Sequence, residues 1–477
     1  MSKFSTLLDE LIQAKNINVN NLSAYCRVDR STMYKLISGK RNPGSLEIVH
    51  RIAEYLHLSP SEVREMTEAY EITRLGDETY YSRKDVLEFI LNVQEIQSSS
   101  GTAFPAKYNF FYSETTEPVV PLSGRISILA ALQNMILKES SFAGGELCIL
   151  AQPEHLETLG LIPLLSVSHS RLSVKHVICI NNVRFPNRYH HNYNLQCLKK
   201  ILPFYGTHCS YQPVYYYDSI ASHFNSFNFM PCVCLTSQAA VIFDSKINTG
   251  FFFQSQDLLQ PFRSQFREIW NSSAPLMKSL ELSPDLPLPR VPAAAALEPG
   301  TYILGFGPCI SSCLPDDIFD KYLNKLLTDP SLLKEHLAAL SRNRGHCYFS
   351  RRSLLHFLKT GLLYETPQKL YYPLEADDRI RLLKKFRLSS SCKDIRMFSG
   401  VFENFPPNFH LVISPGTGYL MFVNRKRQYF YLILEEQNLL RAFYDFVSSL
   451  EESELIFSSE ETNKFLYEII KNKGGIF

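Results

Sequence analysis

The sequence lacks the short motifs that mark the common classes of catalytic site. It has no glycine-rich loop ending in Gly-Lys-Ser or Gly-Lys-Thr, no His-Glu-x-x-His and no Gly-x-Ser-x-Gly. The first motif holds nucleotide phosphates, the second holds a catalytic zinc ion, and the third presents a nucleophilic serine. The sequence therefore predicts a protein that is not an enzyme, with no catalytic residues and no cofactor.

A metal-ligand pattern is also missing. The 11 cysteines are scattered, and the close pairs Cys232–Cys234 and Cys309–Cys313 have no second pair at the spacing of a zinc site. We therefore predict no metal site, and reduced thiols that pack in the core of a cytoplasmic protein.

Long apolar runs and a strong net charge are absent as well. No apolar run reaches the about 20 residues that a membrane-spanning helix needs, and the first residues do not resemble a signal peptide. The formal net charge is only +2. Any contact with nucleic acid must therefore come from a local basic patch, and no membrane partner is predicted.

The first 75 residues do contain a series of short amphipathic helices. Apolar spacing predicts helices over residues 4–14, from an Asn18 cap onward, over 30–37 behind an Asp29 cap, over 45–56, and from a Ser59 cap onward. In the second helix, Leu22, Tyr25 and Cys26 are expected to face inward. Five short helices joined by tight turns predict a compact all-α domain.

Positive charge is concentrated in one part of this helical region. Residues 27–41 hold five basic side chains and one acidic one, a local balance of +4, whereas residues 1–76 hold ten basic and nine acidic residues. The five basic residues are Arg27, Arg30, Lys35, Lys40 and Arg41. Such a cluster on a short helix is typical of a surface that contacts DNA phosphates.

The segment from Leu22 to Pro43, LSAYCRVDRSTMYKLISGKRNP, resembles the lambda-repressor/Cro-like (XRE) helix-turn-helix family of bacterial regulators. The resemblance extends over about residues 4–70. It implies that the helix after Asp29 enters the major groove of double-stranded DNA. The DNA-binding residues it implies are Arg30 and Ser31 for base reading with Thr32 beside them, Tyr34 and Lys35 one turn later, and Ser38, Lys40 and Arg41 for the backbone.

The sequence departs from the family pattern at three positions. Arg27 stands where a turn glycine is usual, Val19 where a phosphate-contacting glutamine is frequent, and Ile37 where a glutamate is frequent. Arg27 must therefore hold a turn that favours glycine. The resemblance leaves Asn20 or Asn21 to replace the contact that Val19 cannot make.

The rest of the chain predicts a large α/β region with a mixed sheet. We expect a helical domain at 1–74, a linker with a helix at 75–116, an α/β subdomain at 117–283, a Pro/Ala linker at 284–299 and a second α/β subdomain at 300–477. The helix over residues 83–97 is expected either to dimerise the protein or to dock on the next domain. Trp270 is expected in the core.

The two α/β subdomains show a similar order of elements. Three short strands and a helix with a Leu-Leu-x-x-Phe pattern are predicted over residues 232–262, and again over 410–443. This order is faintly similar to one half of a phospholipase-D-type fold, but no histidine starts the His-x-Lys of that fold's catalytic site. The similarity favours two related halves with a ligand-binding cleft.

Taken together, these features predict a sequence-specific, DNA-binding transcriptional regulator. The helical domain would read an operator, and the C-terminal region would sense a small-molecule or peptide effector, form a homodimer, or both. An effector would change the spacing of two recognition helices. The alternatives are an enzyme, or a protein-interaction module, fused to the helix-turn-helix domain.

Overall fold

The computed structural model describes residues 1–98, 117–162, 165, 172–181, 192–207, 209–220, 228–282, 300–324, 331, 334, 345–364, 370–388, 394–423 and 429–472. These residues form two compact units. Unit 1 comprises Met1–Asp85 together with Asn192, and unit 2 comprises the described residues of Val86–Phe185 and Tyr193–Phe477. Much of the predicted linker at 75–116 and all of the linker at 284–299 lie outside the described residues, so the predicted domain boundaries stay predictions.

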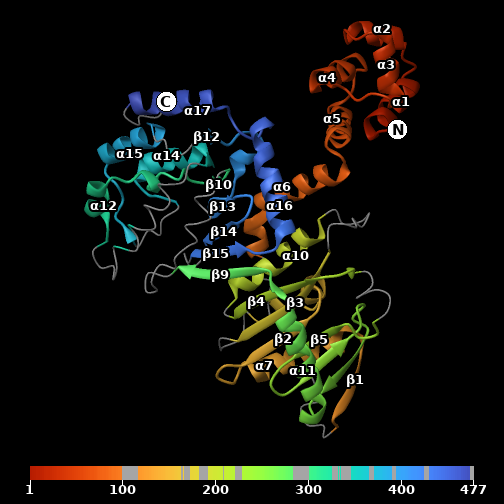
Figure 1. Cartoon of the computed structure of the whole chain (residues 1–477), viewed down its shortest axis with the longest axis vertical. Helices are drawn as coiled ribbons and strands as arrows, with labels where there is room; N and C mark the ends of the chain where they lie inside the picture. The colour runs from red at the N-terminus through yellow and green to blue at the C-terminus, as the bar shows by residue number, and fades with distance from the viewer. Residues whose placement is uncertain are drawn as a thin grey trace. The chain divides into compact units, whose positions relative to one another are not determined.

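Unit 1 is helical, as predicted. Its helices are α1 (Lys3–Ala14), α2 (Val19–Tyr25), α3 (Arg30–Ile37), α4 (Leu46–Tyr55), α5 (Pro60–Leu75) and the start of α6 (Asp77–Ser98) (Figure 1). Asn18 and Asp29 cap α2 and α3 with their side chains, and Ser59 forms a capping box with Glu62 at α5. These caps satisfy amide groups that a helix start leaves without a partner.

One contiguous core holds the first five helices together. Its fully buried members include Phe4 and Leu8 of α1, Leu22 of α2, Met33 of α3 and Ile52 of α4. The prediction that Tyr25 faces inward is wrong: its side chain is 44% exposed and its ring lies 5.3 Å from that of Tyr55. Tyr25 is the last residue of α2, so its ring packs on α4 while its hydroxyl is hydrogen-bonded to the Glu54 carboxylate at the surface.

Helix α6 begins directly after Gly76, earlier than the start at residue 83 that the sequence predicts. The earlier start is possible because Gly76, with a φ of +85°, is by itself enough to end α5. The second half of α6 belongs to unit 2. Val86, Phe89, Ile90 and Val93 are at most 1% exposed and lie in the core of that unit. The Phe89 ring is 5.4 Å from the ring of Phe443. Of the two roles predicted for this helix, docking on the next domain is confirmed.

Unit 2 contains two mixed α/β sheets of eight and seven strands, which confirms the predicted fold class. Sheet A contains β1 (Val119–Ser123), β2 (Glu146–Leu150), β3 (Ser173–Ile180), β4 (Ser210–Tyr217), β5 (Cys232–Leu235), β6 (Ala240–Phe243), β7 (Thr249–Phe253) and β8 (Ala274–Pro275). Its helices are α7 (Gly124–Glu139), α8 (Pro153–Thr158), α10 (Tyr193–Ile201), the 3-10 helix η3 (Leu202–Gly206) and α11 (Gln256–Ser272).

Sheet B contains β9 (Met277–Leu282), β10 (Tyr302–Gly305), β11 (His346–Phe349), β12 (Asp394–Met397), β13 (Phe409–Ile413), β14 (Gly418–Val423) and β15 (Tyr429–Leu434). Its helices are η5 (Ser311–Cys313), α12 (Asp316–Tyr322), α14 (Arg351–Thr360), α15 (Ala376–Leu388), η7 (Gly400–Asn404), α16 (Gln437–Ser449), η8 (Leu450–Glu452) and α17 (Ser459–Lys471).

The two sheets repeat one topology. In sheet A, β2, β3 and β4 are parallel, and β2 also pairs antiparallel with β5, which continues into the meander β5-β6-β7. In sheet B, β10, β11 and β12 are parallel, and β10 pairs with the meander β13-β14-β15 in the same way. The strands β1 and β9 pair with the last meander strand of their sheets. The predicted similarity of the two halves is therefore confirmed at the level of topology.

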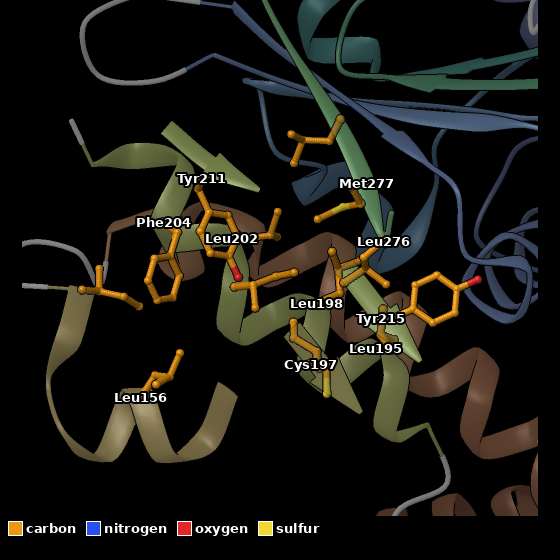
Figure 2. Close-up of a cluster of buried hydrophobic side chains, with 14 of the residues drawn as sticks. Leu156, Leu195, Cys197, Leu198, Leu202, Phe204, Tyr211, Tyr215, Leu276 and Met277 are labelled. Atoms are coloured by element: carbon orange, nitrogen blue, oxygen red, sulfur yellow. The ribbon is translucent and has the colours of Figure 1, made fainter. Parts of the chain in front are cut away.

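A short segment of chain joins the two sheets. Only Leu276 separates β8, which pairs with β4 of sheet A, from β9, which pairs with β15 of sheet B. Figure 2 shows Leu276 and Met277 beside the buried side chains of α10, η3 and β4. There the rings of Phe204 and Tyr211 stack with their centroids 4.5 Å apart. The sheets therefore share one apolar core.

A separate apolar cluster lies between α11 and sheet A. Leu259 and Phe266 of α11 are buried against Val177, Val214 and Leu235 of the sheet. Trp270, predicted to be a core residue, is half-buried at the edge of this cluster. The prediction is right about the apolar face of α11 and wrong about complete burial, because the tryptophan lies near the last turn of the helix.

Candidate nucleic-acid interface

The start of α3 is fixed by a local hydrogen-bond network. The Asp29 carboxylate accepts hydrogen bonds from the Thr32 hydroxyl at 2.6 Å and from the Thr32 amide at 2.8 Å. These bonds, the hydroxyl bond first, hold the pKa of the Asp29 carboxyl below its ordinary value. The carboxylate is therefore ionised at neutral pH, and α3 begins with a defined orientation.

The apolar residues Met33 and Leu36 anchor α3 in the core of unit 1. They leave one side of the helix in solvent. Eight of the nine predicted DNA-contacting residues are exposed, and Thr32 is half-buried; the exposed ones are Asn20, Arg30, Ser31, Tyr34, Lys35, Ser38, Lys40 and Arg41. Tyr34 is 53% exposed, so its ring and hydroxyl are accessible to a ligand.

The hydrogen bonds divide the predicted residues into two groups. The Thr32 hydroxyl is engaged with Asp29 and also accepts a hydrogen bond from the Arg41 guanidinium at 3.4 Å. Ser38 donates to the carbonyl of Lys35 at 3.4 Å. Throughout unit 1, where Met1–Asp85 is fully described, Arg30, Tyr34 and Lys40 have no side-chain hydrogen bond to another residue. Their side chains are thus free to meet a ligand.

Ion pairs separate the cations of unit 1 further. Lys3, Lys15, Arg51 and Arg74 each lie within 4 Å of a carboxylate; the pairs are Lys3–Asp77, Lys15–Glu62, Arg51–Glu47 and Arg74–Glu71. Six other cations of residues 1–76 have no ion pair within the described residues, and five of them lie between residues 27 and 41. The sixth is Arg64 on α5. Unneutralised charge is therefore concentrated on α3 and the turns that flank it.

Two turns position this surface. Arg27, between α2 and α3, has a φ of +56°, so a non-glycine residue holds the left-handed turn, as the sequence predicts. Gly39, after α3, has a φ of +72°, and a Cβ atom there would lie 2.8 Å from the Ser5 hydroxyl. Glycine thus lets the basic tail, Lys40 and Arg41, pass close to the start of α1. Arg27 is itself exposed and cationic, although the predicted contact residues do not include it.

Residues 7–68 match the family described as the Cro/C1-type HTH DNA-binding domain. The chain carries a helix-turn-helix DNA-binding domain. The predicted family resemblance is confirmed, and the matched region contains α2, α3 and the whole basic cluster. For the Cro/C1-type domain, DNA binding is the role that this match assigns; the match does not extend into unit 2.

The other comparisons leave unit 2 without an assigned role. No protein with a curated description matches the sequence. Structures with some likeness include TrmBL2, an archaeal chromatin protein, with 11% identity, a TM-score of 0.21, and coverage of 57% of this chain and 99% of that one. Another is the phosphatidylserine synthase of Haemophilus influenzae Rd KW20, with 10% identity, a TM-score of 0.23, and coverage of 80% and 98%. TM-scores this low support no inference about ligand or activity.

Across the described parts of the chain, no helix is both long and apolar enough to span a membrane. Over the same residues, no group of three or more His, Cys, Asp or Glu side chains is arranged to hold a metal ion.

Proposed function

We propose that the protein is a sequence-specific transcriptional regulator whose helix α3 reads an operator in double-stranded DNA. The observation that carries this proposal is the concentration of unpaired, exposed cations on α3 and its flanking turns. In water these like charges repel one another. DNA phosphates neutralise them, and the cations condensed on the DNA are released into solution. The Cro/C1-type match supports the same surface independently.

The positions of the side chains suggest distinct roles. Arg30 and Ser31 begin α3 and are exposed, so we assign them to base edges in the major groove, with Tyr34 and Lys35 one turn further along. Lys40 and Arg41 follow the helix, and we assign them to phosphates together with Ser38 and Asn20. The Thr32 hydroxyl fixes the start of α3 and the position of the Arg41 side chain, so we assign it an indirect role in DNA binding.

We propose that unit 2 receives a signal and forms a homodimer, and that it acts by binding rather than by catalysis. A dimer would place two α3 helices on half-sites one turn of DNA apart. Burial raises the pKa of the Cys234 thiol to about 12 and lowers the pKa of the His176 imidazole to about 4. Both groups are neutral at pH 7, which supports a structural role for them. The reduced thiols suit a cytoplasmic location.

The test is binding of the full-length protein to DNA selected from random sequences, followed by titration with the selected site. We expect Arg30→Ala to weaken binding to that site by about 1–3 kcal/mol and to relax the preference at one base position. Lys40→Ala should weaken binding to all sequences alike and lower the slope of log K against log salt by about 1.

Arg74→Ala is the matched control, because Arg74 pairs with Glu71 on α5. It removes the same charge from unit 1 and should leave both affinity and salt slope unchanged. If Arg30→Ala and Lys40→Ala also bind DNA as the wild-type protein does, or if no sequence is enriched over random DNA, α3 does not read an operator.

A further inference from the structure

A cavity of about 280 Å³ opens between α11 and sheet A, within unit 2. Its lining comes from four elements and the turn after β5. The α11 side contributes Arg263, Phe266, Arg267 and Trp270, which follow one another along a single helix face. The sheet contributes Glu146 and Cys148 from β2, Lys175 from β3, Leu235 from β5 and the following Thr236 and Ser237.

The charged groups around the cavity have a net positive balance. Three cations and one carboxylate line it, and Lys175 lies 2.5 Å from Glu146, so that pair is neutral. Arg263 donates to the carbonyls of Thr236 and Ser237 and to Gln256, which fixes its guanidinium in place. Arg267 is exposed and has no ion-pair or hydrogen-bond partner among the described residues. Two guanidinium groups thus leave an excess of positive charge at the opening.

The same cavity has an aromatic wall. The rings of Phe266 and Trp270 stack with their centroids 6.1 Å apart, and the Lys175 ammonium lies 5.8 Å from the Trp270 ring. Leu235 and Cys148 add apolar surface beside them. Burial raises the pKa of the Cys148 thiol to about 12, so this side chain is neutral at pH 7. The wall therefore offers a flat ring contact next to the free arginine.

A buried carboxylate positions two segments that line the cavity: the start of β2 and the turn after β5. Glu139 of α7 is 3% exposed, and it accepts hydrogen bonds from the Glu146 amide at 3.0 Å and from the Ser237 hydroxyl at 2.6 Å. It also accepts from the Ser237 amide at 3.1 Å. The sheet side of the cavity is therefore preformed, as small-molecule sites usually are.

We infer that this cavity binds a small planar organic anion, with its ring against Trp270 and Phe266 and its anionic group toward Arg267 and Arg263. The volume suits a ligand of one or two rings, because it lies just below the range of about 300–1,000 Å³ that is usual for small-molecule sites. This inference rests on the proposed function in one respect: the ligand would be the effector of the regulator. Binding of the anion to the cavity does not require DNA, so it is measured separately from DNA binding.

Trp270 is the only tryptophan in the sequence, so its fluorescence reports on this cavity without a label. The probes are benzoate and 2-naphthoate, with benzamide and 2-naphthamide as their neutral counterparts. We expect at least one anion to give a saturable change in the fluorescence of the full-length protein, and its neutral counterpart to bind about tenfold more weakly or worse. If neither anion saturates, or if the neutral partner binds equally well, the inference is wrong.

Arg267→Gln tests the anion contact, since removal of an exposed, unpaired side chain leaves the fold intact. It should weaken binding of the anion about tenfold. Lys246→Gln is the control: it removes an equal charge from the exposed turn between β6 and β7, outside the cavity lining, and should change nothing. Equal effects of the two substitutions would mean nonspecific attraction, and would overturn the site.

The effector role needs a second measurement. The bound anion should shift the affinity of the wild-type protein for its selected DNA site, and Arg267→Gln should abolish that shift while leaving the affinity without anion unchanged. An anion that saturates Trp270 without changing DNA affinity would contradict the effector role. Absence of DNA binding with intact anion binding would instead contradict the proposed regulator, so the two failures are distinguishable.

Discussion

At the scale of single residues, left-handed backbone at non-glycine positions is a feature of unit 1. Arg27 has a φ of +56° and His57 a φ of +49°, and both side chains are exposed at the end of a short helix. A side chain in this conformation carries a steric cost that glycine avoids. Glycine is the usual residue at the Arg27 turn in the resembled family, so Arg27 carries a steric cost here that glycine would avoid.

We predict that Arg27→Gly stabilises unit 1 by about 0.5 kcal/mol, since the relief of strain exceeds the extra backbone entropy of glycine only slightly. The same substitution should lower the salt slope of DNA binding by about 1, because a phosphate contact is lost. Amide hydrogen exchange of residues 1–85 in the full-length protein measures the first effect, and DNA titration at several salt concentrations measures the second.

His57→Gly provides the comparison for Arg27→Gly. It relieves the same conformation at a turn outside the basic cluster, between α4 and α5. Its effect on exchange should resemble that of Arg27→Gly, while the salt slope stays at the wild-type value. An unchanged slope in both variants would show that Arg27 holds the turn without touching DNA.

At the scale of elements, local pattern predicts most of the structure. The caps of α2, α3 and α5 and the meander strands of both sheets lie where the sequence places them. The unpredicted strand β1 contains Pro121, which removes a ladder donor, and it lies at the edge of sheet A where a proline is tolerated. The unpredicted β9 contains the adjacent polar residues Lys278 and Ser279, which break the alternation expected of a strand, and the unpredicted β11 begins with the polar His346 and is only four residues long.

For the candidate interface, too, the local features could be predicted from the sequence and the long-range ones could not. Its exposed cations follow from the apolar spacing of α3, which is a local property. The absence of ion pairs there could not be predicted, because the neutralising partners of Lys3 and Lys15 lie on α6 and α5, distant in sequence. The proposed anion cavity could not be predicted from the sequence either, because the residues that line it come from β2, β3, β5 and α11.

The docking of α6 gives a prediction at this scale. Phe89→Ala should destabilise unit 2 by about 3–5 kcal/mol, because it leaves a cavity beside Phe443 in a fully buried core. Urea denaturation followed by Trp270 fluorescence measures this change. Glu88→Ala, one residue earlier, removes only a surface ion pair with Lys199 and should cost less than about 1 kcal/mol. Comparable losses in the two variants would contradict the docked position of α6.

At the scale of the whole molecule, unit 2 is one topology used twice, with different surroundings for each copy. Both copies bury a histidine on a central strand: His176 of β3 in sheet A and His410 of β13 in sheet B. His176 is hydrogen-bonded to the Tyr211 hydroxyl at 2.7 Å and to the Ala151 carbonyl at 2.9 Å. Burial lowers the pKa of each imidazole to about 4. The two halves therefore share a pH dependence.

In the unfolded chain these imidazoles take up protons below pH about 6.5, whereas in the folded protein they do so only near pH 4. The unfolded state thus binds more protons between these values. The stability that neutral burial provides is complete above pH 6.5 and is lost as the pH falls toward 4. Burial also lowers the pKa of His155, which acts in the same direction. Unit 2 should therefore weaken in mild acid, before most carboxylates titrate.

We expect the free energy of unfolding of unit 2, followed by Trp270 fluorescence in urea, to fall steadily from pH 6.5 to pH 5. Each buried histidine contributes a slope that rises from about 0.7 kcal/mol per pH unit at pH 6.5 toward about 1.4 kcal/mol per pH unit near pH 5. His176→Gln should lower the overall stability and also remove about that much of the slope. Tyr211→Phe removes the hydrogen-bond partner without removing the titrating group, so it should lower stability and keep the slope. The same slope in His176→Gln and wild type would show that the imidazole is protonated within the fold.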